Sequence, residues 1–439
     1  MAKTTDDTLL PREPIHRLVE PVVRFMHVEA ASGVLLLVCT AMALVLANSA
    51  AGSWYASIWK TPVGFAIGDF SMMHSLKHWI NDGLMAVFFF VVGLEVKREL
   101  VHGELRDPRR AALPVAAALG GMVVPAALYL LLQGGGAAAR GWGIPMATDI
   151  AFVVGCMAVL GPRVPKILRV LLLSLAIVDD IGAILVIAVG YTESLDLRML
   201  GLAGAGLVLV WGLGRLGVRS FAVYVLIGVV VWFGFHESGV HATIAGVLLG
   251  LLTPAGTYLP TGTVSQLLRR ADDTLHGGAW GDLSHRSDAV RGFTGAVREV
   301  ISPLEYLEGR LHPWSSFVIM PVFALANAGV AFAAADFVDP VAIAIMAGLV
   351  LGKPVGILLM SLLAVKLVTK GLPEGLTWPS LVGGGFLSGI GFTMALFIAG
   401  LALDGPALNA AKVGVLGASA LAAVIGMILL VAVLPKPAK

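Results

Sequence analysis

Long apolar segments alternate with short polar ones along most of the chain. Such segments cross a bilayer as helices, because about 20 apolar helical residues span its hydrocarbon core. We predict spans at about residues 30–48, 79–96, 111–132, 141–160, 170–190, 199–213, 221–235, 239–252, 313–334, 340–365, 381–403 and 413–434. The pattern therefore predicts an all-α membrane protein with twelve transmembrane helices.

The polar segments predict how these spans are organised. Residues 1–28 form a polar tail without the apolar core of a cleavable signal peptide. Spans one to eight occupy residues 29–252, a polar loop follows at 253–311, spans nine to twelve occupy 312–434, and 435–439 form a second tail. Mixed charges and several glycines favour a flexible loop at 253–311 over a short amphipathic helix. Residues 49–78 combine aromatic and polar side chains, as segments at a membrane interface do.

Composition supports the membrane assignment, and the basic residues predict its orientation. Only 13% of the residues are charged, whereas soluble domains carry about 25%. With twelve spans, 24 of the 30 Lys and Arg residues fall on the side of the N-terminus, five fall on the other side, and Lys353 lies inside a span. Because basic residues concentrate in cytoplasmic loops, we expect both termini and the loop 253–311 in the cytoplasm, and residues 49–78 on the outer side.

The fifth span carries two adjacent carboxylates at its centre. In VLLLSLAIVDDIGAILVIAVG, residues 170–190, Asp179 and Asp180 are the only charged residues. Each costs about 2.5–3.5 kcal/mol at the middle of a membrane helix. A buried polar pair that only fixes helix packing is one explanation. Because ionisable residues at this depth usually have a function, we favour an ion-binding pair.

Three other spans carry polar or helix-breaking residues near their middle. In the fourth, Pro145 precedes Thr148 and Asp149, and because proline removes a helix hydrogen bond we expect a break there. In the tenth, Lys353 is the only charged residue near the midplane. In the eleventh, GGGFLSGIGFTMALF contains five glycines, which favours unwinding, although close helix packing would also explain them.

The fourth and eleventh spans are predicted to run in opposite directions. Two interrupted helices of opposite direction indicate an inverted-repeat transporter with an ion site at the midplane. Facing helix ends present partial charges that an acid and a base can compensate, and Asp149 and Lys353 suit these two tasks. We therefore expect inverted-topology repeats in which the two interrupted helices cross.

The available ligand atoms indicate a hard cation. Carboxylates, Thr hydroxyls and carbonyls freed at a helix break suit such ions. No cluster of His and Cys is expected with the spacing of a transition-metal site, and Cys39 and Cys156 lie in apolar runs that favour packing over a disulfide. A carboxylate balanced between burial and a nearby Lys can hold either a proton or a metal ion. Loading the cation then expels protons, and more than one proton per cation makes the exchange electrogenic.

Seven ordered blocks of the sequence resemble the NhaA family of bacterial sodium/proton antiporters. They are NDGLMAVFFFVVGLEVKREL (81–100), ATDIAF (147–152), AIVDDIGAI (176–184), GVHATIAG (239–246), LHPWSSFVIMPVFALANAGV (311–330), GKPVGI (352–357) and SGIGFTMALFIAGLA (388–402). The resemblance implies a multi-pass protein of the bacterial inner membrane that extrudes Na⁺ or Li⁺ in exchange for protons, serving sodium and pH homeostasis without a cofactor. It also implies a homodimer, for which residues 49–70 are the expected contact.

The resemblance assigns expected roles to the intramembrane residues. Asp180 would bind the cation or the proton, with Asp179 as its partner. Lys353 would pair with Asp179 when the cation is absent, or release a proton itself. Thr148 and Asp149 would lie at the helix break near the site.

The resemblance also implies a cytoplasmic cluster through which activity rises at alkaline pH. Its candidates are Glu95, Arg98, Glu99, His241, Glu308 and His312. Ordinary ion pairs at a helix end would equally explain the members on the second span, and a satisfied polar contact would explain His241. Asp82 would line an outer funnel, or simply place a negative charge at a helix N-terminus.

Two departures and three alternatives remain open at this point. Gly309, in LEGRLHPW, stands where a histidine is expected in some relatives, so the pH profile of the family does not carry over, and the loop 253–311 is longer than expected. A sodium-coupled organic-anion symporter would need a second, larger pocket with positive groups. A passive channel would need continuous spans with a ring of acids. An enzyme is least expected, since no nucleophile–base set or metal motif appears. No nucleic-acid partner is expected either.

Overall fold

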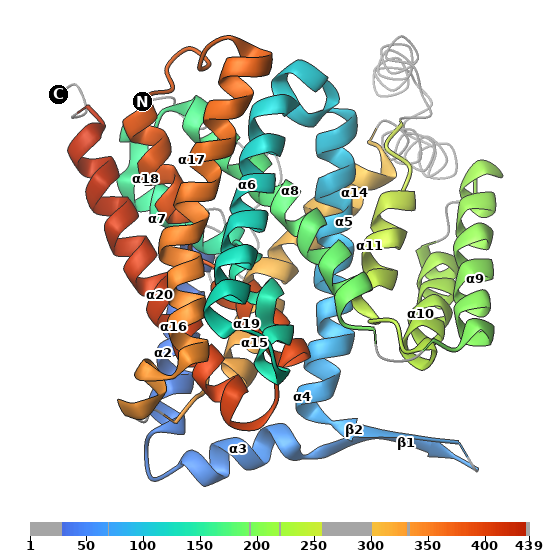
Figure 1. Ribbon diagram of the computed structural model, residues 1–439. Coiled ribbons are helices and arrows are strands. Elements are labelled where there is room, and N and C mark those ends of the chain that lie inside the picture. The colour runs from blue at the N-terminus through green and yellow to red at the C-terminus, as the bar shows by residue number, and fades with distance from the viewer. Residues whose placement is uncertain are drawn as a thin grey trace, which may run out of the picture.

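The computed structural model describes residues 29–68, 70–192, 195–218, 221–256, 301–331 and 334–435. The predicted tail at 1–28, most of the predicted loop at 253–311 and nearly all of the tail at 435–439 lie outside these residues. The described part is mostly helical, with one small sheet (Figure 1). It therefore has the predicted all-α membrane architecture, apart from that sheet.

The elements follow one another closely along the chain. The α-helices are α2 (Glu29–Ala47), α3 (Gly52–Lys60), α4 (Leu76–His78), α5 (Met85–Val101), α6 (Pro108–Gln133), α7 (Ile150–Leu160), α8 (Lys166–Gly190), α9 (Leu197–Arg215), α10 (Phe221–Ser238), α11 (Thr243–Leu252), α14 (Pro303–Trp314), α15 (Met320–Asn327), α16 (Pro340–Ala347), α17 (Lys353–Ala364), α18 (Trp378–Ser388), α19 (Phe392–Ala402) and α20 (Gly405–Val433). The 3₁₀ segments are η2 (Glu104–Arg106), η3 (Ala137–Met146), η4 (Gly161–Arg163) and η7 (Ala334–Val338). The π-helical turns are η1 (Trp79–Leu84), η6 (Ser315–Ile319), η8 (Gly348–Gly352) and η9 (Val365–Thr369).

Each predicted span coincides with a helix or with a pair of helices. Within the described residues, eight helical segments are long and apolar enough to cross a membrane, or ten if each of two bent pairs counts as one span. The predicted eighth span is α11, which has only ten residues, and the helical run at the predicted ninth span is not among these candidates. Length and composition thus support eight to ten spans.

The segment at residues 49–78 contains a helix and a hairpin. Helix α3 is bent by 113° from α2, and strands β1 (Pro62–Ile67) and β2 (Phe70–Ser75) pair antiparallel from Pro62↔Ser75 to Ile67↔Phe70. Figure 1 shows α3 and the hairpin at one end of the molecule, lying across the direction of the long helices. The sequence predicted an interface segment here but not the strands, because polar and apolar residues do not alternate regularly along them.

The predicted loop at 253–311 is helical in its last part, which corrects the sequence interpretation. Helix α14 begins at Pro303, and Ser302 and Glu305 form a capping box at its start. The side chain of Ser302 accepts from the backbone N–H of Glu305 at 3.2 Å, and Glu305 accepts from the N–H of Ser302 at 3.1 Å. These reciprocal bonds provide partners for two backbone N–H groups that have none within the helix. The helix can therefore begin at Pro303, well before the predicted apolar span at 313–334.

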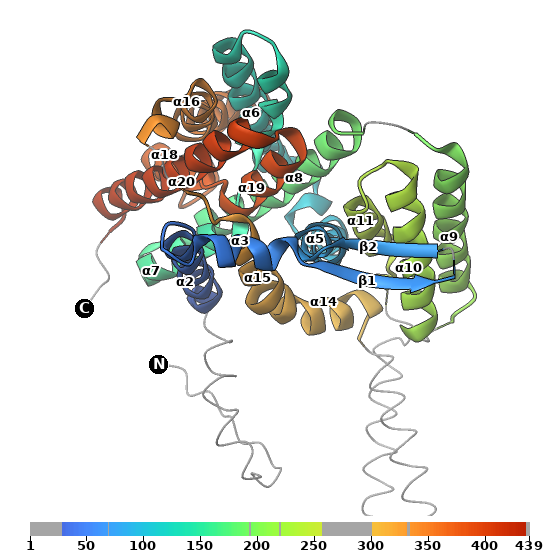
Figure 2. The ribbon, with the colours of Figure 1, turned by 90° about the horizontal axis from the view of Figure 1, so that it is seen from below.

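The helices divide into two groups around α5, α8 and α19. Helices α9, α10 and α11 lie together beside α5, whereas α16, α18 and α20 lie on the opposite side (Figure 2). The smaller group has its own buried cluster around Val231 and Phe235. In the larger group α6 and α17 touch backbone to backbone: a Cβ built on Gly120 would lie 2.0 Å from the carbonyl oxygen of Gly356. Only glycine permits this approach, which brings Lys353 on α17 toward the centre.

Candidate functional site

The first helix break lies between η3 and α7. Pro145 lies near the end of η3, and the next residues, from Ala147 to Asp149, have extended backbone. Helix α7 then begins with Asp149 as its N-cap, whose Oδ1 accepts from the N–H of Phe152 at 3.1 Å. An aspartate at this position also stabilises the positive end of the helix dipole. The predicted break in the fourth segment is therefore present.

The second break separates α18 from α19, which are bent by 45° relative to each other. The chain leaves the helix at Gly389 and re-enters it at Phe392. A Cβ on Gly389 would lie 2.4 Å from the carbonyl oxygen of Leu349, so this position also needs glycine for a close approach to η8. Both explanations offered for the glycine-rich segment, unwinding and close packing, thus apply.

The two breaks contact each other through backbone and side-chain hydrogen bonds. The N–H of Asp149 donates to the carbonyl of Ile390 at 2.7 Å. Oδ2 of Asp149 accepts from the N–H of Thr393 at 3.0 Å and also from its hydroxyl. One carboxylate therefore caps the N-terminus of α7 and reaches the first turn of α19 as well. Asp149 is 1% exposed, so these bonds replace the hydration that it loses.

Lys353 lies where a helix and a break approach one another. It follows the π-helical turn η8 and is fully buried, with 0% of its surface exposed. Its Nζ lies 3.0 Å from Oδ2 of Asp179 and also donates to the carbonyl of Met146, the last residue of η3. A cation at this place compensates the negative end of η3 and pairs with a buried acid.

The adjacent acids Asp179 and Asp180 have different partners. Oδ2 of Asp179 also lies 2.5 Å from the hydroxyl of Thr148. That hydroxyl lies 3.1 Å from the carbonyl of Ser388 as well, and because it has one proton it donates to one of these oxygens at a time. Asp180 makes no hydrogen bond or ion pair with any described residue, although it is only 4% exposed.

The arrangement provides a buried carboxylate that is free to take a ligand. Oδ1 of Asp179 also lacks a hydrogen-bond partner in the described part of the chain. Both acids lie on α8, which supplies a rigid support for their side chains. Carboxylate oxygens of this kind bind a proton or a hard cation. The site can thus exchange one for the other.

Four of the residues suggested for pH response lie together at the C-terminal part of α5. Arg98 forms an ion pair with Glu308 of α14, and Nε2 of His312 lies 3.7 Å from Oε1 of Glu95. Burial raises the pKa of Glu308, and the nearby guanidinium opposes this shift. Glu95 is also close enough to Asp180 for their charges to interact. We call Glu95, Arg98, Glu308 and His312 the α5–α14 cluster.

Glu99 points away from the α5–α14 cluster. Its Oε1 accepts from the N–H of Glu104 at 3.0 Å and from the hydroxyl of Ser174 at 3.3 Å. Ser174 belongs to α8, the helix of the two acids. Glu99 therefore connects the end of α5 to α8 and to the turn that follows α5.

His241 does not join the α5–α14 cluster and corrects that grouping. Its Nδ1 lies 3.0 Å from the hydroxyl of Thr243, and its ring packs edge-on against Phe397 with 5.6 Å between ring centroids. Its electrostatic neighbours include Asp82 and His236, at the other end of α5. The predicted topology already places the start of the eighth span, at residue 239, on the outer side, so the grouping of His241 with a cytoplasmic cluster was inconsistent with it.

A cluster of histidines beside Asp82 corrects a second expectation. His74, His78 and His236 offer ring nitrogens that all lie within 4.8 Å of one another. The sequence predicted no such cluster. His74 and His78 are four residues apart, a spacing that could have indicated a shared site. His236 comes from α10, which is distant in the sequence.

The structure adds site residues that the sequence analysis did not select. Thr393 bonds to Asp149, and Ser388 contributes its carbonyl to Thr148. Both lie in the glycine-rich segment. Their polar side chains within an apolar run were the sequence feature that could have identified them as site residues. Cys39 and Cys156 are buried free thiols, as packing residues would be.

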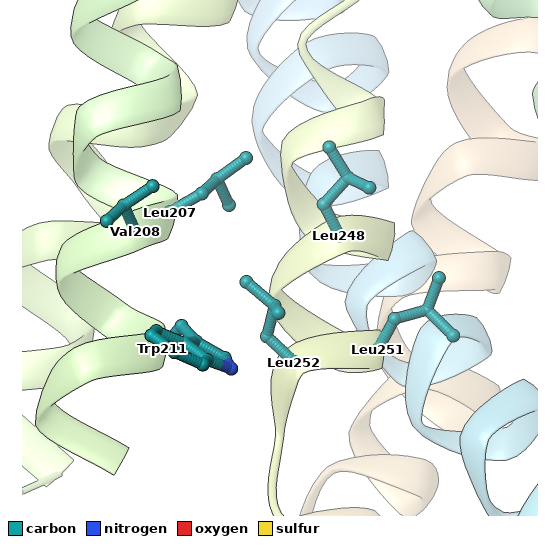
Figure 3. A pocket seen from close by; sticks show the side chains of 6 residues that line it. All are labelled: Leu207, Val208, Trp211, Leu248, Leu251 and Leu252. Atoms are coloured by element: carbon teal, nitrogen blue, oxygen red, sulfur yellow. The ribbon is translucent and has the colours of Figure 1, made fainter. Parts of the chain in front are cut away.

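An apolar hollow between α9 and α11 has the wrong chemistry for an ion site. Leu207, Val208, Trp211, Leu248, Leu251 and Leu252 line about 330 Å³ (Figure 3). The lining offers no carboxylate or hydroxyl oxygen. The acids of α8 therefore remain the candidate site.

Comparison with known proteins identifies similar chains along nearly the whole length. A family model described as Na⁺/H⁺ antiporter 1 matches residues 23–430. The Na⁺/H⁺ antiporter NhaA of Rhodopirellula baltica is 57% identical over 430 residues, 98% of each chain. That of Rhizobium meliloti is 53% identical over 422 residues, 96% of each chain. One from Acidiphilium cryptum is 50% identical over 427 residues, which cover 97% of this chain and 95% of the relative.

Proposed function

This chain belongs to the Na⁺/H⁺ antiporter family of the NhaA proteins, and from this premise we propose how its residues carry out the exchange. The protein exchanges Na⁺ for H⁺ and is a multi-pass protein of a bacterial membrane. It extrudes cytoplasmic Na⁺ or Li⁺ and admits external protons, with Asp180 as the group that binds either ion. Asp180, Asp179 and Lys353 each support this proposal.

The observation that carries the proposal is the difference between the two acids of α8. Asp180 is buried without a hydrogen-bond or ion-pair partner among the described residues. A buried carboxylate without a partner is costly as an anion, so it is stable when it holds a proton or a cation. Asp180 therefore alternates between these two occupants, and loading Na⁺ expels its proton.

Asp179 and Lys353 act as a second, switchable unit. Their ion pair, with 3.0 Å between Nζ and Oδ2, exists while no cation competes for Asp179. When Na⁺ draws Asp179 toward itself, Lys353 loses its partner and releases a proton, because an unpaired ammonium in a buried site is unfavourable. More than one proton then moves for each Na⁺, so the exchange is electrogenic.

The two broken helices provide the structural basis for alternating access. Asp149 compensates the N-terminal ends at the breaks, and Lys353 the C-terminal end of η3, as their hydrogen bonds indicate. We assign twelve spans, counting the short helix α11 and the helical run from α14 to α15 as one span each, and inverted repeats whose fourth and eleventh spans cross. Rocking of one repeat against the other exposes Asp180 to each side in turn.

We also propose how pH regulates the exchange, how the protein is oriented and where two copies meet. The α5–α14 cluster responds to cytoplasmic pH, and the interaction of Glu95 with Asp180 couples it to the site. Both termini lie in the cytoplasm of a cell with an inner membrane, and Asp82 lines the outer funnel. Residues 49–70 form the contact of a homodimer. The protein has no enzymatic activity and requires no cofactor for exchange.

A measurement on proteoliposomes tests the proposal. The purified protein is reconstituted, a pH gradient is imposed, and Na⁺, Li⁺ or K⁺ is added across a range of pH. Collapse of the gradient by Na⁺ and Li⁺ but not K⁺, accelerated when valinomycin clamps the potential, supports electrogenic antiport. A Na⁺-independent leak would indicate a channel, and Na⁺ uptake that requires an organic anion would indicate symport.

A further inference from the structure

Three histidines from three separate elements converge at the end of the molecule that carries the hairpin. His74 lies on β2, His78 on α4 and His236 in the last turn of α10. Their ligand nitrogens lie within 4.8 Å of one another. We propose that these histidines form a binding site for a divalent transition-metal ion such as Zn²⁺, with Asp82 as the fourth ligand. None of these residues belongs to the buried acid–lysine site.

The separations suit a tetrahedral ion after small movements. Zn²⁺ binds His nitrogen and carboxylate oxygen at about 2.0–2.2 Å, so ligand atoms around a tetrahedral Zn²⁺ lie about 3.3 Å apart. Oδ2 of Asp82 lies 3.3 Å from Nδ1 of His236 and 3.7 Å from Nε2 of His78. The histidine nitrogens need to approach one another further, which rotation of the rings can supply.

The rings are held together by aromatic packing rather than by hydrogen bonds to one another. His74 stacks on His78 with 4.3 Å between ring centroids, and His236 lies 5.6 Å from His74 and 5.4 Å from His78. Trp232 stacks on His236 at 5.4 Å, and Trp79 stacks on Trp232 at 6.2 Å. The two indoles therefore pack against the histidine rings.

One nitrogen of the cluster lacks a hydrogen-bond partner. Nε2 of His78 is buried and has no hydrogen-bond partner in the described chain, and its 3.7 Å separation from Asp82 is too long for a hydrogen bond. Ion pairs with Asp82 would account for His236 and His78 but not for His74. A metal ion explains why all three rings converge and satisfies the buried nitrogen.

A bound ion would add a link between elements that already contact one another through Trp79 and Trp232. It would tie β2 to the start of the α5 segment and to α10, and it would neutralise Asp82. A two-stranded hairpin alone is marginally stable, so metal binding is expected to stabilise this end of the molecule against heat.

Metal titration of the purified full chain tests the site. The protein carries an affinity tag without histidines, is stripped with EDTA, and is titrated with ZnCl₂ in a calorimeter. We expect one Zn²⁺ per chain with a Kd in the micromolar range or below, and a rise in melting temperature. His74→Gln, His78→Gln and His236→Gln should each weaken binding at least tenfold, and Asp82→Asn should weaken it as well. His102→Gln, at the opposite end of α5, is the matched control and should bind as the unchanged chain does.

The outcomes separate the proposal from its alternatives. Absence of saturable Zn²⁺ binding, or binding that survives in the triple variant His74→Gln/His78→Gln/His236→Gln, would overturn the site. Full binding by Asp82→Asn would overturn its role as fourth ligand. If a variant elutes as an aggregate, replacing Zn²⁺ with Co²⁺ in the unchanged chain gives a second test. A tetrahedral absorption spectrum supports the site, and an octahedral one contradicts it.

Discussion

Nζ of Lys353 lies 3.0 Å from Oδ2 of Asp179, whereas Asp180, the next residue in the chain, has no ion-pair partner in the described residues. The direction of the two side chains on α8 causes this difference, since neighbours on a helix point about 100° apart. Asp179 faces the broken helix η3–α7 and Lys353. Asp180 is left as the group that can change its occupant without first breaking a salt bridge.

Asp180→Asn is expected to abolish exchange while leaving the protein folded and inserted. An amide neither releases a proton nor carries the charge that binds Na⁺. The measurement is Na⁺-dependent collapse of a pH gradient in vesicles, with protein amount determined by immunoblot. Asp196→Asn, at the exposed N-cap of α9, is the matched control and should exchange normally. Near-normal exchange by Asp180→Asn would remove Asp180 from its proposed role.

Lys353→Ala should destabilise the protein by about 3–5 kcal/mol, because it leaves Asp179 buried without its cation. The melting temperature in detergent should fall, and the pH profile of exchange should shift. Adding Asp179→Asn to Lys353→Ala should recover part of the lost stability, since the unpaired charge is then removed. Lys366→Ala, at an exposed position of η9, controls for the loss of a lysine. Equal melting temperatures for Lys353→Ala and the unchanged chain would contradict this role.

Asp149→Ala should lower the free energy of unfolding more than a similar change at an ordinary cap. Asp149 accepts from Phe152 in α7 and from Thr393 in α19, and each lost cap costs about 0.5–2 kcal/mol. We expect a loss of about 1–4 kcal/mol. Asp339→Ala removes one cap, on Val341 of α16, and is the matched control. Both losses are measured by thermal unfolding, and a loss no larger than that of the control would show that the second helix gains nothing from Asp149.

Glu308→Gln is expected to shift the pH of half-maximal exchange toward acid by about half to one unit. Removing this carboxylate leaves Arg98 unpaired, which adds one positive charge near Glu95 and His312. Positive potential eases proton release, so activation by deprotonation occurs at lower pH. Glu374→Gln, at an exposed position before α18, removes a carboxylate outside the cluster and serves as the control. A shift toward alkali, or equal profiles for both variants, would exclude the α5–α14 cluster from pH response.

Gly120→Ala should destabilise the protein by about 1–3 kcal/mol or more, because its Cβ would meet the backbone of Gly356 rather than a side chain that can move. The built Cβ lies 2.0 Å from a carbonyl oxygen. Gly204→Ala on α9 places a Cβ in open space and should be neutral or slightly stabilising, since alanine favours helix. The melting temperatures of the two variants give the comparison. A loss at Gly204 equal to that at Gly120 would mean that close approach is not the cause.

The sequence by itself determined the helical architecture and most of the residues of the candidate site. The apolar segments located most of the helices, because a span must be long enough to cross the hydrocarbon core, but α14 and α20 begin ten and eight residues before the predicted spans. Asp179, Asp180 and Lys353 were identifiable because charges inside apolar segments are costly. The break at Pro145 was predictable, since a proline removes a hydrogen bond wherever it stands inside a helix.

The family resemblance predicted that Lys353 pairs with Asp179, and the two side chains do meet; residue pattern without that resemblance does not give the partner, which depends on the tertiary structure. Lys353 and Asp179 are 174 positions apart, and nothing local chooses between Asp179 and Asp180 as the partner of the lysine. The cluster of His74, His78 and His236 was missed because it depends on how distant helices pack, whereas the predicted span order already placed His241 at the outer side. The pattern of apolar and polar residues along the sequence predicts which side chains are buried. Which side chain a buried group contacts depends on how the whole chain packs.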